Sequence, residues 1–239
     1  MHLGLRLPGR ALGAVANTDA AGTDAVAVLA SGGLDSAILV GQLASEGHEV
    51  TPIYVRFGLA WEDVELRHLR EFLASLAPSR TKPLVVLEQP VADIYGEHWS
   101  VTGQDVPGRD SPDEAVYLPG RNLLLLAKPS VWCVLNGIPT IALGTLAANP
   151  FPDADREFFA GFSALVGRAL GCALQVITPF AGRAKREVLD AGRQFALDLT
   201  FSCIAPRSAR HCGRCNKCAE RQLAFSELGI PDTTEYAES

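Results

Sequence analysis

The sequence has little that would suit a membrane or a nucleic-acid backbone. Its 239 residues contain no apolar run near the roughly 18 residues that a membrane-spanning helix requires. Lys and Arg total 21 against 27 Asp and Glu, so the chain lacks the basic surplus that extended phosphate-backbone binding needs. We therefore expect a globular cytoplasmic protein that contacts no membrane, and the acidic balance counts against tRNA as a substrate without excluding it.

Two common nucleotide-binding motifs are also missing. No glycine-rich stretch leads into Gly-Lys-Ser/Thr, which excludes a Walker loop, and the G-x-G-x-x-G spacing of a dinucleotide fingerprint is absent. Residues 1–24 show no continuous apolar core followed by a cleavage site, so we expect a loose extension there and not a signal peptide.

Cysteine is scarce outside one cluster. Four of the six cysteines fall within sixteen residues, with the spacing C-x8-C-x2-C-x2-C: Cys203, Cys212, Cys215 and Cys218. Such uneven use indicates a metal site in a reducing compartment and not a disulfide framework. Four thiolates complete the tetrahedral shell of a structural Zn²⁺, although a [4Fe–4S] cluster takes the same ligands. We expect zinc, and the neighbouring His211 as a bystander.

Short apolar runs alternate with helical patterns along most of the chain. The predicted strands are 25–30, 49–56, 83–88, 140–144 and 174–178, and the predicted helices are 36–46, 61–76, 122–136, 158–170 and 185–195. This alternation predicts an α/β fold with a doubly wound parallel sheet over residues 25–198. Residues 93–119 lack periodicity and are expected to be a functional connection or a lid. Residues 199–239 should form a small C-terminal lobe with one closing helix.

A glycine-rich loop, Ser-Gly-Gly-Leu-Asp-Ser, separates the first strand from the first helix at residues 31–36. Its glycines allow close backbone approach, and the free N–H groups of the helix start favour an anion. The plainer interpretation is an ordinary strand-to-helix turn, in which Asp35 caps the helix. The complete string resembles the pyrophosphate-binding loop (PP-loop) of ATP-cleaving adenylation enzymes, which implies that ATP is split between its α and β phosphates.

That resemblance implies ATP and Mg²⁺ as cofactors. Ser31, Asp35 and Ser36 would then be catalytic, with Asp35 helping to hold Mg²⁺ or to orient the loop. The residues expected to contact ATP follow one another in the chain: Ala30, Ser31, Gly32, Gly33, Leu34, Asp35, Ser36, Ala37, Ile38, Leu39 and Val40.

Three further segments extend the resemblance over residues 26–225. They are Tyr-Leu-Pro-Gly-Arg-Asn at 117–122, Phe-Pro-Asp at 151–153, and Lys185 at a helix start. With the loop and the cysteines, they resemble the 7-cyano-7-deazaguanine synthases of queuosine biosynthesis, a PP-loop family with a HUP-like fold. The resemblance implies that 7-carboxy-7-deazaguanine is adenylated, converted to the amide by ammonia, activated again and dehydrated to the nitrile. It also implies a homodimer.

The resemblance assigns roles to the polar residues of these segments. Arg121 and Lys185 would act as catalytic cations on the carboxylate or on the transferred phosphoryl group. The acid substrate would contact these residues: Arg121, Asn122, Phe151, Asp153 and Arg156. The plainer interpretation of Arg121, Asn122 and Lys185 is a surface or helix-cap role.

Two departures from the family pattern bear on the substrate. Phe151-Pro152-Asp153 is followed by Ala154-Asp155-Arg156, so the family's arginine is displaced by one position, and Ala147 stands where an acidic residue is expected. Any guanine-like edge would then be read by Asp153, Asp155 or backbone carbonyls. Three alternatives stay open: an amide ligase that joins the acid to another amine, such as a protein amine; a tRNA-modifying enzyme; and a non-catalytic zinc module.

Overall fold

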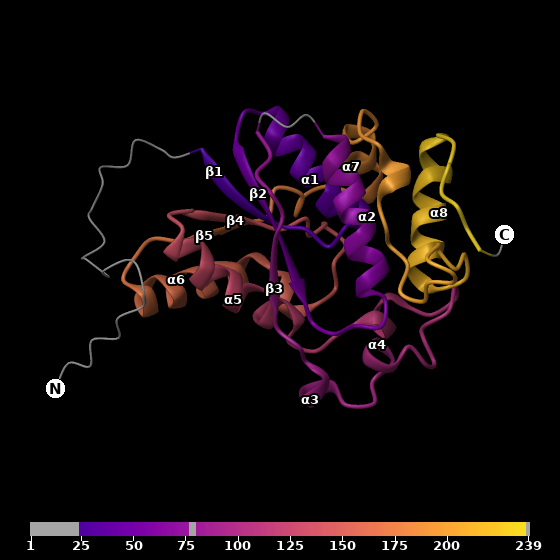
Figure 1. Ribbon diagram of the computed structural model, residues 1–239, viewed down its shortest axis with the longest axis horizontal. Helices are drawn as coiled ribbons and strands as arrows, with labels where there is room; N and C mark the ends of the chain where they lie inside the picture. The colour runs from indigo at the N-terminus through magenta and orange to yellow at the C-terminus, as the bar shows by residue number, and fades with distance from the viewer. Residues whose placement is uncertain (1–23, 77–79, 238–239) are drawn as a thin grey trace.

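The computed structural model describes residues 24–76 and 80–237. The expected extension at 1–24 therefore lies outside the described residues, apart from its last residue. Figure 1 shows a central sheet with helices on both sides and the C-terminal α8 at one end of the molecule.

The sheet has five parallel strands in the order β3-β2-β1-β4-β5. Their bounds are β1 Ala25–Leu29, β2 Glu49–Arg56, β3 Val85–Glu88, β4 Thr140–Ala142 and β5 Gln175–Ile177. All five lie inside the predicted segments, which confirms the doubly wound parallel α/β fold. The strand order reverses direction between β1 and β4, and ligands of such sheets bind beside the carboxyl ends of the strands at that point.

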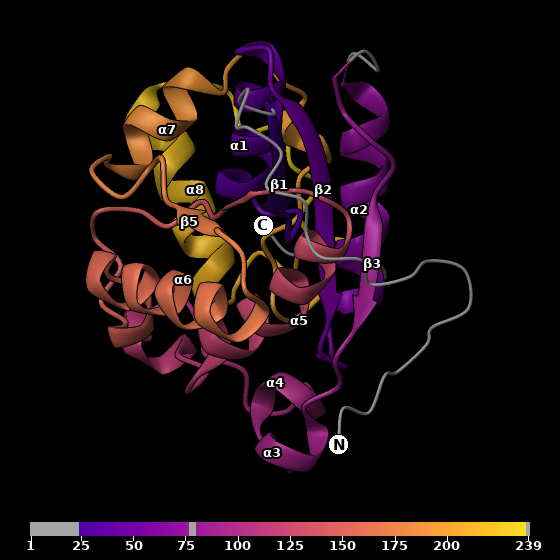
Figure 2. The same cartoon turned by 90° about the vertical axis from the view of Figure 1, so that its left-hand side faces the viewer.

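Side chains that alternate along β1 supply two cores. Val26 and Val28 face α1 (Leu34–Ser45), α2 (Glu62–Ser75) and α7 (Lys185–Ala191), whereas Ala27 and Leu29 face α5 (Arg121–Leu135) and α6 (Arg156–Leu170). Burial on both faces explains why β1 is a continuous apolar run. Figures 1 and 2 show α5 and α6 on the face opposite α1 and α7.

The C-terminal helix α8 (Asn216–Leu228) packs beside α7 (Figure 2). Its Ala224 and Phe225 are buried in the same core as α1, while the four clustered cysteines join the core on the α5 side. A buried arginine, Arg221, fastens this region: its guanidinium donates to the carbonyl oxygen of Leu197 at 2.7 Å and to two threonine hydroxyls. The C-terminal lobe is thus continuous with the cores of the α/β domain.

Two segments differ from the predicted periodicity. Within 93–119 the chain forms three short helical turns: α3 Ala92–Tyr95, α4 Trp99–Thr102 and η1 Asp113–Val116. The α7 helix ends at Ala191 and not near 195, with Gly192 as its C-cap; glycine weakens a helix interior, and a Cβ at Gly192 would come within 2.5 Å of the Ile38 side chain. The remaining short turns are η2 Pro152–Ala154 and η3 Leu197–Leu199.

Candidate functional site

The glycine-rich loop lies at the carboxyl end of β1 and leads directly into α1. The hydroxyl oxygens of Ser31 and Ser36 are 3.2 Å apart, and the Ser31 N–H donates to the Ser36 hydroxyl, also at 3.2 Å. Gly33 is the N-cap of α1 and offers no side chain to its free amides. Two hydroxyls and a set of free helix-start N–H groups therefore converge where an anion can bind.

Gly32 allows this loop to pass close to α2. Its φ of +87° is left-handed, and a Cβ there would lie 3.3 Å from both the Glu65 carbonyl oxygen and the Leu69 Cβ. Glycine adopts this conformation without steric cost, whereas an L side chain does not. The curvature of the loop thus depends on glycine at this position.

The α1 residues that were expected to contact ATP fall into two groups, one at the helix start and one in the buried core. Asp35 and Ser36 lie at the helix start, while Ala37, Ile38, Leu39 and Val40 are fully buried. Leu34 and Ala30 are also buried. The side chains of Ile38, Leu39 and Val40 belong to the core that holds the loop in place, so the exposed polar atoms of the loop come from Ser31 to Ser36.

Asp35 is held by Lys185, a lysine from a distant segment of the chain. Its Oδ2 lies 2.7 Å from Nζ of Lys185, which also lies 3.1 Å from Oε1 of Glu220 on α8. Oδ1 of Asp35 is buried and has no hydrogen-bond partner among the described residues. At the end of β4, Gly144 packs on Asp35: a Cβ there would lie 3.1 Å from the Asp35 carbonyl carbon.

The charges of this network stabilise one another. Burial works against the ammonium of Lys185, but the carboxylates of Asp35 and Glu220 more than offset it, and the pKa of Lys185 is raised. Burial likewise opposes the Glu220 carboxylate, yet Lys185 and Lys217 lower the pKa of Glu220 to about 2. Lys185 was predicted to be catalytic, and it lies beside Asp35; Glu220 was not predicted, and no local pattern marks it.

A second polar group lies between β2, α2 and α5. The hydroxyl of Tyr54 donates to Oε2 of Glu65 at 2.6 Å. Burial raises the pKa of Glu65 to about 8, against the hydrogen bond from Tyr54 and the positive charge of Arg121. Nε of Arg121 is buried and has no hydrogen-bond partner in the described part of the chain. Sequence reasoning missed Tyr54 and Glu65, although a polar residue near the carboxyl end of a parallel strand is a usable signal.

The two segments expected to hold the acid substrate meet at the start of α5. The Asn122 N–H donates to Oδ2 of Asp153 at 2.9 Å, and the Asn122 side-chain amide donates to the Asp153 carbonyl at 3.0 Å. The rings of Tyr117 and Phe151 stack with centroids 4.8 Å apart. Asp153 is buried at 8% exposure, and its carboxylate stabilises the amino end of α5.

The last residues of that group lie at the start of α6. Asp155 is the N-cap of this helix, with Oδ1 accepting from the Phe158 N–H at 2.7 Å. Arg156 follows it and is exposed. The Ala147 N–H donates to the Arg183 carbonyl at 3.2 Å, which ties the segment after β4 to the segment before α7.

The four clustered cysteines bring their sulfurs within 4.8 Å of one another, and all four are buried. Backbone amides support the sulfurs: the N–H groups of Ala205 and Cys212 donate to Cys203 Sγ at 3.3 and 3.2 Å. His211 is outside this group, because its Nε2 accepts from the Ser202 N–H at 3.1 Å. A compact set of four thiols with amide donors fits a tetrahedral metal ion.

A parallel α/β sheet with an SGGLDS loop beside its switch point, together with a C-terminal cysteine cluster, defines the PP-loop class of ATP-dependent enzymes. The family model of queuosine biosynthesis protein QueC matches residues 25–229. The chain therefore belongs to the QueC family.

Curated relatives agree with this membership. Proteins named 7-cyano-7-deazaguanine synthase are 30% identical over 224 residues in Sulfolobus acidocaldarius, 30% over 227 in Methanothermobacter thermautotrophicus and 29% over 223 in Xanthomonas euvesicatoria. The matches cover 88%, 90% and 88% of this chain. They span 47% of the first relative but 99% and 96% of the other two.

Among solved structures, a predicted subunit of tRNA methyltransferase from Methanocaldococcus jannaschii aligns with a TM-score of 0.47 and 17% identity, covering 72% of this chain and 75% of that one. At this level the likeness adds nothing to the assignment. Among the described helices, none combines the length and the apolar character needed to cross a membrane.

Proposed function

We propose that the chain is a 7-cyano-7-deazaguanine synthase, which uses ATP to convert 7-carboxy-7-deazaguanine and ammonia into the nitrile. The loop at residues 31–36 carries this proposal. It presents two serine hydroxyls, the helix-start amides and Oδ1 of Asp35, which has no hydrogen-bond partner within residues 24–76 and 80–237, at one place. The match to the QueC family over 25–229 supports this reaction.

The loop would hold the leaving pyrophosphate. Ser31, Ser36 and the amides at the start of α1 would bind its oxygens, and Lys185 would offset its charge. The substrate carboxylate would attack the α-phosphorus as the bond to pyrophosphate breaks, giving an acyl adenylate. Adenylation turns a carboxylate oxygen, which is a poor leaving group, into part of AMP.

The chain's own groups fit the two metals that this function implies. Oδ1 of Asp35, a buried oxygen without a partner among the described residues, fits a Mg²⁺ ligand. When bound, Mg²⁺ would offset the charge of the phosphates. The sulfurs of Cys203, Cys212, Cys215 and Cys218 fit a structural Zn²⁺, which would stabilise the fold around α8 and leave no position open for a reacting water.

The acid substrate would lie beside the start of α5. The buried Nε of Arg121 has no partner in the described chain, so its guanidinium is available to a carboxylate or phosphoryl oxygen. The stacked rings of Tyr117 and Phe151 offer a planar surface for a base. The side-chain NH₂ of Asn122 donates to the Asp153 carbonyl oxygen, so the side-chain carbonyl of Asn122 would accept a hydrogen bond from a base edge. Arg156 would lie at the rim.

Ammonia would then attack the acyl carbon, lose a proton and displace AMP to give the amide. In a second cycle the amide oxygen would take up AMP, and loss of AMP with a proton would give the nitrile. No glutaminase-type segment is evident in the sequence, so free ammonia is the proposed nitrogen source.

Mass spectrometry of the organic products tests the reaction. The protein would be incubated with ATP, Mg²⁺, ammonia and 7-carboxy-7-deazaguanine, and we expect the nitrile. Accumulated amide would mean arrest before dehydration, and a mass added to a protein amine would favour the conjugating alternative. Failure to bind the acid or its amide by calorimetry, even beside a non-hydrolysable ATP analogue, would overturn the deazaguanine assignment.

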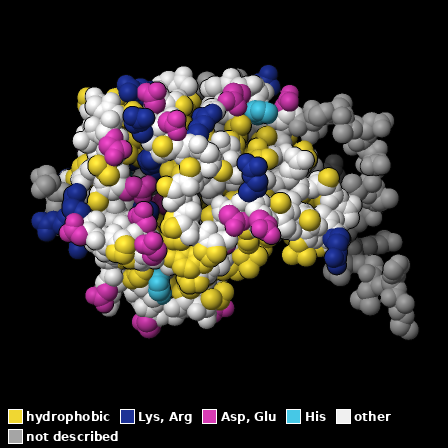
Figure 3. Space-filling view, turned by 180° about the vertical axis from the view of Figure 1, so that it is seen from behind, with side chains coloured by type: hydrophobic (Ala, Val, Ile, Leu, Met, Phe, Trp, Pro, Cys, Tyr) yellow, Lys and Arg dark blue, Asp and Glu magenta, His cyan; other side chains and the backbone are white. Residues whose placement is uncertain are grey.

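A tRNA substrate is the weaker alternative. On the face seen in Figure 3, Lys and Arg side chains are scattered among Asp and Glu and form no continuous basic stripe. We also propose that the protein works in the cytoplasm as a homodimer, as the family resemblance implies. Sedimentation of the full chain across a range of concentrations tests the dimer.

A further inference from the structure

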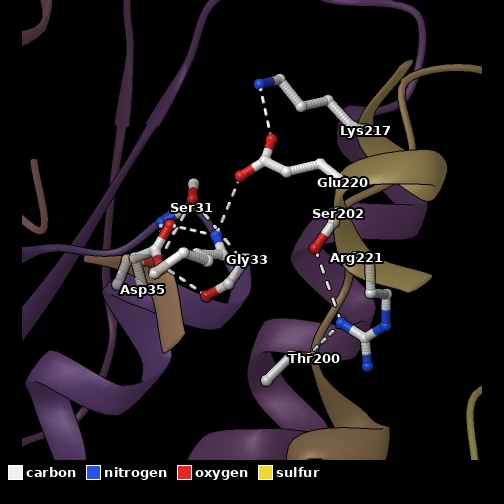
Figure 4. A network of polar contacts seen from close by, with 10 residues as sticks. Ser31, Gly33, Asp35, Thr200, Ser202, Lys217, Glu220 and Arg221 are labelled. Atoms are coloured by element: carbon white, nitrogen blue, oxygen red, sulfur yellow. Dashed lines mark hydrogen bonds and ion pairs between the residues drawn. The ribbon is translucent and has the colours of Figure 1, made fainter. Parts of the chain in front are cut away.

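Lys185 is held from two sides by segments that are far apart in the sequence. Asp35 comes from the first turn of α1, and its Oδ2 lies 2.7 Å from Nζ of Lys185. Glu220 comes from α8, and its Oε1 lies 3.1 Å from the same Nζ. Figure 4 shows Glu220 reaching from α8 toward the group around Asp35. The lysine side chain is 21% exposed, so its ammonium lies in a partly closed site.

Glu220 is itself fixed by the cysteine-containing region. Its second oxygen, Oε2, lies 2.8 Å from Nζ of Lys217, which stands between two of the clustered cysteines. Cys215 is the N-cap of α8 and Cys218 lies in its first turn, so Glu220 follows the cluster by only two residues. Four alternating charges thus run from the phosphate loop to the metal-binding region: Asp35, Lys185, Glu220 and Lys217.

With Asp35 as its only partner, Nζ of Lys185 could take several positions around the Asp35 carboxylate. A lysine is a flexible point charge with four rotatable carbons, so a single ion pair fixes the position of its ammonium poorly. A second carboxylate from the opposite side restricts Nζ to the space between α1 and α8. That space borders the loop where the phosphates would bind.

We propose that Glu220 is a positioning residue that sets Nζ of Lys185 against the phosphate loop, so that the cysteine-containing region helps to align the ATP site. This inference rests on the proposed function, because it assumes that Lys185 acts on a phosphate or carboxylate of the reactants. Glu220 does not touch the reactants and acts through Lys185.

The first test is a double-mutant cycle. Glu220→Gln keeps the shape of the side chain but removes its charge, and we expect kcat for acid-dependent AMP formation to fall about 10- to 100-fold, with a smaller change in the KM for ATP. In a Lys185→Met background the same change should have almost no further effect. Glu227→Gln, on the exposed side of α8, is the matched control and should behave as wild type. Metal content should be unchanged in all these variants, and any fall in the unfolding midpoint should be confined to variants at Glu220 or Lys185, whose charges stabilise one another.

The second test does not depend on activity. The protein would be treated with acetic anhydride in the absence of ATP, and acetylation of Lys185 would be measured by mass spectrometry. The rate of acetylation reports how strongly the two carboxylates keep the Lys185 amine protonated and shielded from the reagent. We expect Lys185 to react several-fold faster in Glu220→Gln than in wild type or in Glu227→Gln. Equal rates, or an additive loss of activity in the Lys185→Met background, would overturn the role of Glu220. If Lys185→Met instead kept full activity while the acetylation result held, the proposed role of Lys185 in the reaction would fail and the positioning contact would stand.

Discussion

Glu65 combines a half-buried carboxyl with a hydrogen bond from the hydroxyl of Tyr54 at 2.6 Å. Burial raises its pKa from 4.5 to about 8, so the folded protein binds a proton there that the unfolded chain releases at lower pH. The resulting contribution to stability is complete below pH 4.5 and is lost as the pH rises toward 8. The protonation of Glu65 in the folded protein therefore changes near neutral pH.

Glu65→Gln should flatten this dependence, because glutamine keeps the neutral state at every pH. In urea unfolding between pH 5 and 8, the wild-type free energy of unfolding should fall more steeply than that of the variant. Glu71→Gln, on an exposed position of the same helix, should retain the wild-type slope. Parallel curves for wild type and Glu65→Gln would show that Glu65 is already ionised at pH 5.

Asp35→Asn tests the carboxylate of the phosphate loop. We expect acid-dependent AMP release to fall at least about 100-fold, because the carboxylate proposed to hold Mg²⁺ beside the phosphates is lost. The free energy of unfolding should change by about 1 kcal/mol or less, since Lys185 keeps its contact with Glu220. Asp93→Asn, at an exposed position, should leave both quantities unchanged. Release of ADP and phosphate by the wild-type protein would contradict the proposed reaction.

At the scale of elements, the turn between β1 and α1 depends on close packing over α2. Gly32→Ala places a Cβ 3.3 Å from the Glu65 carbonyl and requires a left-handed residue, which costs on the order of 1–2 kcal/mol. We expect lower stability together with a loss of acid-dependent AMP release, because the loop amides are displaced. Gly47→Ala is the matched control: its φ is +99°, yet nothing lies within 4 Å of the added Cβ. That variant should lose stability but keep its turnover; equal activity in the two variants would contradict the role of the loop.

The cysteine-containing region should bind one zinc per chain and depend on it for stability. Metal analysis of aerobically purified protein should give zinc near stoichiometry and little iron. Cys215→Ala should strongly lower the free energy of unfolding, because metal binding is coupled to folding. Cys172→Ala, a cysteine outside the cluster, is the control and should retain the zinc. A brown protein with broad visible absorption would show an iron–sulfur cluster instead.

At the scale of the whole molecule, local apolar runs were enough to predict the sheet. The segments 25–30 and 140–144 read as buried strands, and both proved to be neighbours at the centre of the parallel sheet. The loop was also predictable from local sequence, because residues 31–36 follow one another in the chain. The close contact between Gly192 and Ile38 was not predictable, because the two residues are distant in the sequence.

The polar contacts across the molecule were beyond local patterns. Glu220 meets Lys185, and Tyr54 meets Glu65, only after α8 and α2 have packed on the same side of the sheet. Asn122 and Asp153 were each predicted for the substrate, but the hydrogen bonds that join them could not be derived from their spacing. Long-range pairs of this kind follow from tertiary packing, which periodicity in one segment does not encode.

Activation of a carboxylate as an adenylate can be followed with an oxygen label. 7-Carboxy-7-deazaguanine with both carboxylate oxygens replaced by ¹⁸O would be incubated with ATP, Mg²⁺ and ammonia, and the AMP would be analysed by mass spectrometry. We expect one ¹⁸O atom in the phosphate of each AMP released, since each substrate oxygen leaves as part of AMP, and a nitrile without label. AMP without label, or label found in ADP or inorganic phosphate, would contradict activation as an adenylate.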